Sequence, residues 1–255
     1  MVKQIIRADA YKTRKYFHKN GESFLNVSEF FYDTIQGEGV NSGRPAAFLR
    51  LQHCTLSCQY CDTTEVWRYG SQYTFHELFD LIDSTMLIPK LLGGMHLVLT
   101  GGSPLLQQDA LYDFIKAFYG TYQFKPYIEV ENECVLMPSI VFADCVDCWN
   151  NSPKLLSSGI LAGARYKPDV LLRMALYKNS WFKFVIQIPE EWKEIEDLYL
   201  KPGLIQKNQV ILMPRGETPE ELSKYRELTF NMATENNVIY SDRVHIVLFG
   251  KKIGV

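Results

Sequence analysis

The sequence has no apolar run approaching the 18 residues that a membrane-spanning helix requires, no internal repeat and no low-complexity segment. Its 27 Lys and Arg almost balance its 29 Asp and Glu, so the broad basic face of a general nucleic-acid binder is missing. The opening segment 1–20 lacks the apolar core of a signal peptide, and six cysteines in 255 residues are too few for a disulfide scaffold. These absences predict a cytoplasmic protein whose cysteines bind a metal.

What is present is typical of a globular enzyme. Apolar residues make up 47% of the chain and charged residues 22%, and the length is enough to bury a full core. Residues 1–24 are basic with interspersed aromatics and are interpreted as an N-terminal extension, solvated or capping the domain, with a nucleic-acid contact as the alternative. The remaining residues 25–255 are expected to form one domain.

Short apolar segments alternate with longer amphipathic ones after Leu25. Helix-start signals support the alternation, because Thr74 stands three residues before Glu77, Pro104 suits a first turn and Thr218 precedes Pro-Glu-Glu. Such alternation predicts an α/β fold with a largely parallel sheet. Buried strands are expected at 46–51, 96–100, 126–130, 182–188, 209–213 and 244–249, and helices at 74–92, 104–119, 189–200 and 217–236.

A cysteine loop follows the expected strand at 46–51. The spacing Cys54-x₃-Cys58-x₂-Cys61 places three thiolates close enough to bind one centre. Three thiolates suit a [4Fe–4S] cluster in which one iron has no protein ligand and can bind a small molecule. A zinc site needs four ligands, so the alternative is a zinc knuckle completed by His53 or Asp62.

The surroundings of this loop resemble the radical S-adenosylmethionine superfamily. Tyr60 stands just before the last cysteine, and Gly101-Gly102-Ser103-Pro104 follows a later strand. The resemblance implies that the free iron binds the amino and carboxylate groups of the methionine moiety of S-adenosylmethionine, and that an electron from the cluster cleaves the sulfonium. Ser103 departs from the superfamily pattern, which has Glu there, and this departure affects one contact to the amino group.

Further motifs narrow the resemblance to the 7-carboxy-7-deazaguanine synthases over residues 25–255. The family converts 6-carboxy-5,6,7,8-tetrahydropterin to 7-carboxy-7-deazaguanine with loss of ammonia, on the route to queuosine and other deazapurines. The resemblance therefore implies an incomplete, modified (β/α) barrel, a catalytic S-adenosylmethionine, Mg²⁺, a homodimer and an electron donor such as flavodoxin. The motifs are Gln36-Gly37-Glu38-Gly39, Gly43-Arg-Pro, Cys61-Asp62-Thr63, Ser152-Pro153-Lys154, Lys183-Phe-Val, Leu212-Met-Pro and Arg243-Val-His245.

The resemblance also assigns roles to single residues. Arg50 is expected to bind the substrate carboxylate through its planar fork, and Thr63 is expected to bind Mg²⁺. No catalytic side chain is expected beyond the cluster and the cofactor radical. Further substrate-binding residues are expected to be Ile35, Gln36, Gly37, Glu38, Thr100, His245 and Val255. Cofactor-binding residues are expected to be Tyr60, Cys61, Asp62, Gly102, Glu129, Ser152, Pro153, Lys154, Met213, Pro214, Arg215 and Gly216.

Several of these residues have a second interpretation. Glu38 could be an N-cap or half of an ion pair, and His245 could be a core histidine in the last expected strand. Of Glu129 and Glu131, strand alternation is expected to turn only one inward. Val255 would act through its α-carboxylate, which could pair with the guanidine-like edge of a pterin, unless the tail is mobile.

The sequence also offers a second cysteine pair and two alternative function classes. Cys145-x₂-Cys148 could suggest a second cluster, but the sequence offers no fourth ligand nearby, so these residues are expected to be buried free cysteines. A zinc-stabilised RNA-binding module would also explain a cysteine loop beside a basic arm. A glycyl-radical activase shares the cysteine spacing but lacks the Gln-Gly-Glu-Gly and Ser-Pro-Lys motifs.

Overall fold

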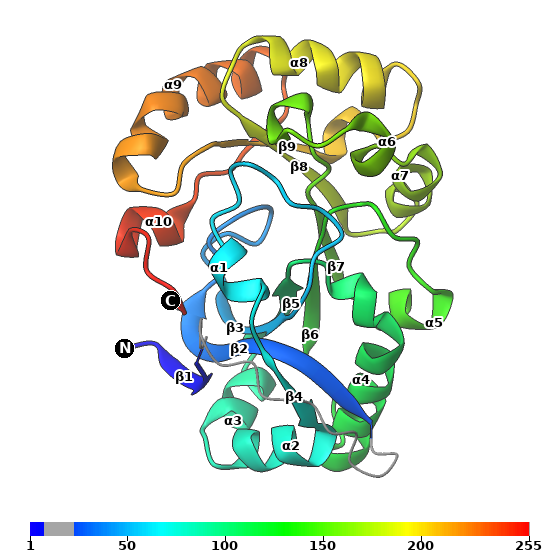
Figure 1. Cartoon of the computed structure of the whole chain (residues 1–255), viewed down its shortest axis with the longest axis vertical. Helices are drawn as coiled ribbons and strands as arrows, with labels where there is room; N and C mark the ends of the chain where they lie inside the picture. Colours follow the sequence, from blue (N-terminus) through cyan, green and yellow to red (C-terminus); the bar gives the residue numbers. More distant parts are fainter. Residues whose placement is uncertain (8–22, 255) are drawn as a thin grey trace.

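One curved sheet of ten strands forms the centre of the computed structural model, which describes residues 1–7 and 23–254. The strands are β1 (Lys3–Ile6), β2 (Phe24–Ile35), β3 (Pro45–Leu51), β4 (Ser71–Thr74), β5 (His96–Gly101), β6 (Tyr127–Asn132), β7 (Cys148–Asn151), β8 (Ser180–Ile186), β9 (Val210–Pro214) and β10 (Ile239–Tyr240). Their order is β1, β2, β3, β5, β6, β7, β8, β9, β10, and β4 pairs with β2. Within the described residues β1 and β10 do not pair with each other, so the barrel stays open, as expected (Figure 1).

Parallel pairing runs from β3 to β10, and helices make the crossovers that parallel strands require. The helices are α1 (Thr64–Trp67), α2 (Phe75–Asp83), α3 (Leu87–Leu92), α4 (Gln108–Tyr122), α5 (Ile140–Ala143), α6 (Ala162–Arg165), α7 (Pro168–Ala175), α8 (Glu190–Ile195), α9 (Pro219–Glu235) and α10 (Val244–Phe249). Figure 1 shows α2 to α9 around the outside of the curved sheet, with α1 over its hollow. Because the parallel strands point one way, the loops that follow them gather at one edge.

The core lies between the sheet and these helices. Trp149 of β7, Phe182 of β8 and Phe114 of α4 are almost completely buried within it. Strands covered on both faces read as continuous apolar runs, which explains why these segments could be recognised from sequence.

The helix starts expected from the sequence are confirmed. The hydroxyl of Thr74 accepts a hydrogen bond from the backbone N–H of Glu77, whose carboxylate accepts one from the N–H of Thr74, so α2 begins with a complete capping box. The Thr218 hydroxyl accepts from the N–H of Glu221 at the start of α9. In the ranges 1–7 and 23–254 no helix is long and apolar enough to cross a membrane.

The expected strand at 244–249 is wrong, because this segment forms the helix α10. A run of Val, Ile, Leu and Phe has high strand propensity, but short apolar runs do not distinguish strand from helix. Tertiary contacts decide here: β10 ends at Tyr240, and the chain then turns from the sheet so that the N–H of Val244 donates to the carbonyl of Gly37 at 2.9 Å. Of the α10 residues, Ile246 is buried whereas Leu248 is exposed.

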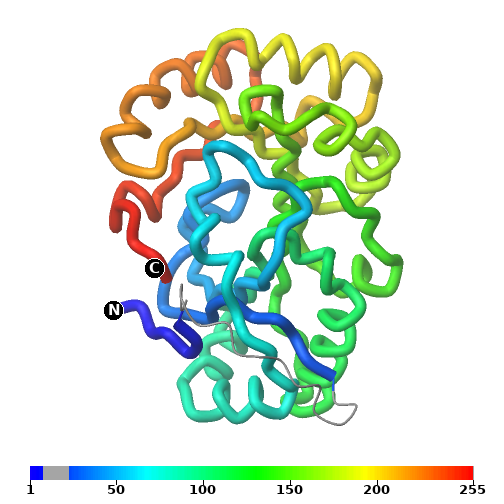
Figure 2. The backbone as a smooth tube through the Cα atoms, in the orientation of Figure 1, coloured from blue at the N-terminus to red at the C-terminus, as the bar shows by residue number. Residues whose placement is uncertain are grey.

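The two ends of the described chain meet at one side of the sheet. In Figure 2 the C-terminal segment lies beside β1 and β2, and Gly254 packs against the side chain of Gln4. Residues Lys3–Ile6 belong to the segment interpreted as an extension, yet they pair with β2. Residues 8–22 and Val255 lie outside the described residues, so the interpretation of 1–24 as an extension stays a prediction.

Candidate active site

A pocket opens at the edge of the sheet where the parallel strands end. All three cysteines of the loop line it, together with residues from the ends of β2, β3, β5, β6, β8 and β9 and from the segment that carries Arg243 and His245. Of the residues expected to bind substrate, cofactor or Mg²⁺, the following line this pocket: Ile35, Gln36, Gly37, Glu38, Arg50, Tyr60, Cys61, Asp62, Thr63, Thr100, Gly102, Ser152, Lys154, Met213, Pro214, Arg215, Gly216 and His245.

The cysteine loop connects β3 to α1 and packs tightly on the loop after β5. A Cβ atom on Gly102 would collide with the carbonyl of His53 and with the Cβ of Cys54, so only glycine allows this approach. Burial raises the pKa of the Cys54 and Cys58 thiols, so both are neutral until a metal displaces their protons. Three thiols around one pocket, without a fourth in the loop, fit a cluster that keeps one iron open.

Four residues of the expected cofactor set lie beside the thiols. The guanidinium of Arg215 lies 5.5 Å from the ring centroid of Tyr60, a cation–π contact that connects the cysteine loop to the loop after β9. On the loop after β7, Lys154 donates a hydrogen bond to the Ser152 hydroxyl at 3.0 Å. Pro153 between them is not among the described residues that line the pocket.

The hydroxyl of Thr63 lies 3.7 Å from the sulfur of Cys61. Thr63 is the N-cap residue of α1, but its side chain makes no capping hydrogen bond within the described structure. A hydroxyl that lines the pocket and is not used in a cap is suited to a hard cation.

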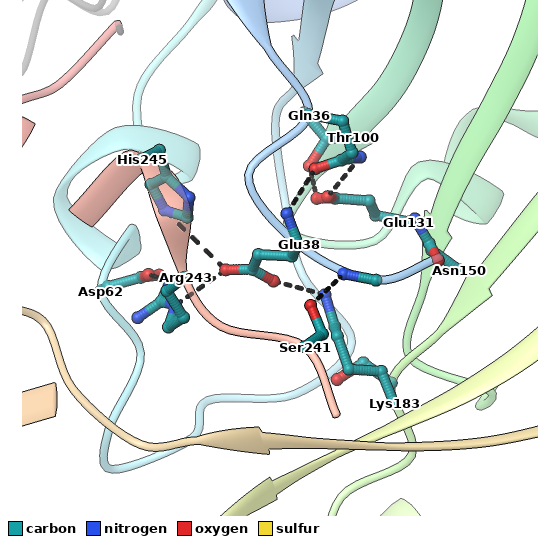
Figure 3. Close-up of polar contacts among 12 residues, drawn as sticks. Gln36, Glu38, Asp62, Thr100, Glu131, Asn150, Lys183, Ser241, Arg243 and His245 are labelled. Atoms are coloured by element: carbon teal, nitrogen blue, oxygen red, sulfur yellow. Dashed lines mark hydrogen bonds and ion pairs between the residues drawn. The ribbon is translucent and has the colours of Figure 1, made fainter. Parts of the chain in front are cut away.

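Figure 3 shows a network of buried charges on the side of the pocket formed by the C-terminal segment. Glu38 lies at its centre and accepts hydrogen bonds from Lys183 and, at 2.8 Å, from Arg243. Arg243 also pairs with Asp62, which follows the last cysteine, and donates to the carbonyl of Gly216. The ion-pair interpretation of Glu38 is therefore confirmed. His245 lies 3.8 Å from the same carboxylate, within the helix α10 rather than in a strand.

The charges of this network stabilise one another. Burial disfavours ionised Glu38, but Lys183 and Arg243 outweigh it and hold the pKa of that carboxyl well below its usual range. Burial likewise opposes ionisation of Asp62, and Arg243 again lowers the net pKa. Burial lowers the pKa of His245, so the imidazole is neutral at pH 7. The backbone of Gly37 lies against this ring, where a Cβ would collide with it.

Polar side chains at the ends of β2, β5 and β6 form a second group. Glu131 accepts from the Thr100 hydroxyl at 2.6 Å and from the Gln36 amide at 3.4 Å (Figure 3). The amide of Gln36 also donates to Glu129 at 2.6 Å. A side-chain amide and a hydroxyl beside a carboxylate provide both donors and acceptors for a heterocycle edge.

The expectation that alternation turns only one of Glu129 and Glu131 inward is wrong. Residues two apart on a strand share a face, and both carboxylates contact Gln36. They differ in depth: Glu131 lines the pocket, whereas Glu129 is fully buried behind it and accepts from Asn41 at 2.8 Å and from Asn150. Glu129 supports Gln36 from behind, and the carboxylate that reaches the pocket is Glu131.

Arg50 lies at the end of β3 and lines the pocket. Its Nε donates to the buried carboxylate of Glu29 on β2 at 2.6 Å, with the two residues paired across the strands. Burial opposes the charge of Arg50, but Glu29 raises its net pKa, so the guanidinium stays cationic. With Nε held by Glu29, the fork is fixed for an anionic ligand.

Six described pocket residues with polar side chains were assigned no role from the sequence: Asn132, Glu133, Asn150, Lys183, Glu217 and Arg243. Lys183 and Arg243 were noted only as parts of motifs. A signal was available for Lys183, because a lysine inside an otherwise apolar strand is buried only when it has a partner. Cys145 and Cys148 do not line the pocket in the described structure; Cys148 is buried and Cys145 partly so.

Comparisons with known proteins agree with this geometry. Residues 35–131 match the family model described as a 4Fe-4S single cluster domain. The 7-carboxy-7-deazaguanine synthase of Pyrobaculum aerophilum is 32% identical over 231 residues, which cover 90% of this chain and 97% of that protein. That of Halobacterium salinarum is 29% identical over 256 residues, covering 88% of this chain and 90% of that protein. The crystal structure of QueE from Escherichia coli has a TM-score of 0.62 at 18% identity, covers 87% of this chain and 95% of that chain, and shares the fold.

Proposed function

The chain belongs to the 7-carboxy-7-deazaguanine synthase family, and from this membership we propose that it contracts the ring of 6-carboxy-5,6,7,8-tetrahydropterin to give 7-carboxy-7-deazaguanine and ammonia. It is a lyase of the radical S-adenosylmethionine superfamily, with a [4Fe–4S] cluster and S-adenosylmethionine as cofactors. The observation that carries the proposal is that three thiols and a group of buried charges line the same pocket. Family membership sets aside the zinc-stabilised RNA-binding module and the glycyl-radical activase.

Cys54, Cys58 and Cys61 would hold the cluster, which when bound supplies the electron that cleaves the sulfonium of S-adenosylmethionine. Gly102, which packs on the cysteine loop beside Cys54, would contact the methionine moiety, and Tyr60, Ser152, Lys154 and Met213–Gly216, which line the same pocket, would contact the rest of the cofactor. Glu129 and Pro153 take no direct part in this proposal, because neither lines the pocket among the described residues.

The carboxylated pterin would occupy the other half of the pocket. Arg50 offers a fixed, cationic fork for the carboxylate, and Gln36, Thr100 and Glu131 offer donors and acceptors for the ring edge. The neutral His245 ring, packed on Gly37, would bound the ring face. The charges of Asp62, Glu38, Lys183 and Arg243 neutralise one another, so these residues would hold this wall of the pocket in place without adding net charge.

Mg²⁺ at Thr63 is part of the proposal, supported by a pocket-facing hydroxyl that is not used in a helix cap. A homodimer, an electron donor such as flavodoxin and a place in the queuosine pathway come from the family resemblance. Exposed apolar residues of α10, Leu248 and Phe249 among them, support a covered surface there. A reducing, cytoplasmic setting suits a site that needs three free thiols. The role of Val255 in substrate binding stays a prediction.

Anaerobic reconstitution with iron and sulfide tests the proposal. We expect a brown protein with about four irons per chain, and a product with the mass of 7-carboxy-7-deazaguanine when S-adenosylmethionine, a reductant and the carboxypterin are added. Omitting the carboxypterin is the matched control. A protein that binds zinc but no iron, or a loaded enzyme that leaves the carboxypterin unchanged, would overturn the proposed function.

A further inference from the structure

Glu133 is a buried carboxylate that the proposed function does not use. It follows β6, lines the pocket and is only 5% exposed. Its Oε1 accepts a hydrogen bond from the hydroxyl of Thr55 at 2.8 Å, whereas its Oε2 is buried without a partner among the described residues. An unpaired buried carboxylate oxygen is costly, so its retention beside a ligand pocket indicates a donor on the ligand.

A chain of hydrogen bonds connects Glu133 to the cluster loop. Thr55 lies directly after Cys54, and its N–H donates to the Ser103 hydroxyl at 2.9 Å while its own hydroxyl lies 3.1 Å from that of Ser103. Ser103 in turn lies 3.6 Å from the sulfur of Cys54. Glu133 is therefore near Cys54, the first cluster cysteine, and near Gly102, which packs on the same loop. The methionine end of S-adenosylmethionine would lie there.

Ser103 is poorly suited to receive a ligand donor. It is fully buried, and its oxygen already accepts the N–H of Thr55. The one hydroxyl proton of Thr55 is used on Glu133. At the Glu133 end of this series of hydrogen bonds, Oε2 of Glu133 is the acceptor that has no partner among the described residues.

The other pocket carboxylates are already engaged. Both oxygens of Glu131 accept hydrogen bonds, from Gln36 and Thr100. Glu38 is held by Lys183 and Arg243, Asp62 by Arg243, and Glu217 by Lys251. Glu133 thus has the free oxygen that an N–H donor of a ligand requires.

We propose that Glu133 binds the amino group of the methionine moiety of S-adenosylmethionine, in place of the carboxylate that this chain lacks at Ser103. The inference rests on the proposed function, because it takes S-adenosylmethionine as the ligand. The Thr55 hydroxyl fixes one oxygen of Glu133, and the second oxygen accepts an N–H of the amino group. Glu133 is a binding residue for the cofactor in this arrangement.

The test uses the anaerobically reconstituted enzyme and two ligands: S-adenosylmethionine and its analogue without the methionine amino group. Glu133→Gln keeps the oxygen that Thr55 contacts but puts an amide donor opposite the ligand's donor. We expect equilibrium dialysis to show about 10- to 100-fold weaker binding of S-adenosylmethionine, the range for a hydrogen bond to a charged group. The affinity for the amino-free analogue should change less than about twofold. The preference for S-adenosylmethionine over this analogue should therefore shrink by about 10- to 100-fold.

Glu191→Gln is the matched control, because Glu191 of α8 is also a buried glutamate with one oxygen unpartnered among the described residues, but it does not line the pocket. Its cofactor preference should equal that of the parent. Equal losses for both ligands in Glu133→Gln, or no loss for either, would overturn the inference. If Glu133→Gln does not bind the cluster, Glu133→Asp, which shortens the side chain, is tested in its place. An unchanged preference of Glu133→Asp for S-adenosylmethionine over the amino-free analogue would also overturn the inference. A parent enzyme that binds no S-adenosylmethionine would instead refute the proposed function.

Discussion

Replacing Glu38 by Gln removes the central charge of the buried network with almost no change of shape. Lys183 is only 4% exposed and Arg243 9%, and both donate to Glu38. Arg243 still has its ion pair with Asp62 in this variant, so the loss of stability comes mainly from the unpaired Lys183. Removing one partner of a buried pair costs about 3–5 kcal/mol, and we expect about 3 kcal/mol because one of the two cations keeps an anion. A chain of 255 residues has an unfolding entropy of about 0.5 kcal/mol/K, so Tm should fall by about 6 °C.

Thermal unfolding followed by circular dichroism, at matched cluster content, measures this loss. In the double variant Glu38→Gln/Lys183→Met no buried lysine is left unpaired, so most of the lost Tm should return. Lys193→Met is the control, because Lys193 pairs with Asp197 at 2.9 Å on the surface, with 75% of its side chain exposed, and should change Tm by less than about 2 °C. The reasoning would be refuted if Glu38→Gln lowered Tm by less than about 2 °C. It would also be refuted if the double variant lost as much Tm as the two single variants together.

Three other predictions concern the cluster, the substrate and pH. Ala at any one of the three loop cysteines should abolish cluster binding, whereas Cys145→Ala and Cys148→Ala should leave the iron content unchanged; iron reduced by half in either would revive the second-cluster interpretation. Arg50→Lys should raise KM for the carboxypterin while cleavage of S-adenosylmethionine without substrate persists, because an ammonium cannot replace the fork that Glu29 orients; an unchanged KM would remove Arg50 from the site. Glu38 has a folded-state pKa well below its unfolded value of about 4.3, so its contribution is present above that value and is lost as pH falls through the folded pKa. The Tm difference between the parent and Glu38→Gln should therefore stay constant from pH 8 to 5 and shrink only in stronger acid; shrinkage between pH 7 and 5 would contradict this.

The sequence allowed the buried parallel strands and the cysteine loop to be predicted because both are local signals. Apolar runs such as 96–100 and 209–213 are covered on both faces, and the capping box at Thr74 needs only four residues. The three cluster cysteines lie in one loop, so their spacing alone indicates a shared ligand.

Long-range contacts explain what could not be predicted. Glu38 pairs with Lys183, which is 145 positions away in the sequence, and with Arg243, which is 205 positions away. No local sequence pattern predicts such pairs. The segment 244–249 has the composition of a strand, but contacts with Gly37 make it a helix. The different depths of Glu129 and Glu131 depend on Gln36 and Asn41 from the loop between β2 and β3 and on Asn150 from β7.

The pairing of Asp62 with Arg243 has a consequence for biosynthesis. The two residues are 181 positions apart, so at 5–20 residues per second the ribosome adds Arg243 roughly 10–40 s after Asp62. Throughout that interval the thiols of the cysteine loop exist while the pocket still lacks the wall that Arg243 and His245 provide. An oxygen-sensitive cluster inserted during elongation would face solvent on that side, whereas insertion after release of the chain would meet a site whose wall is complete.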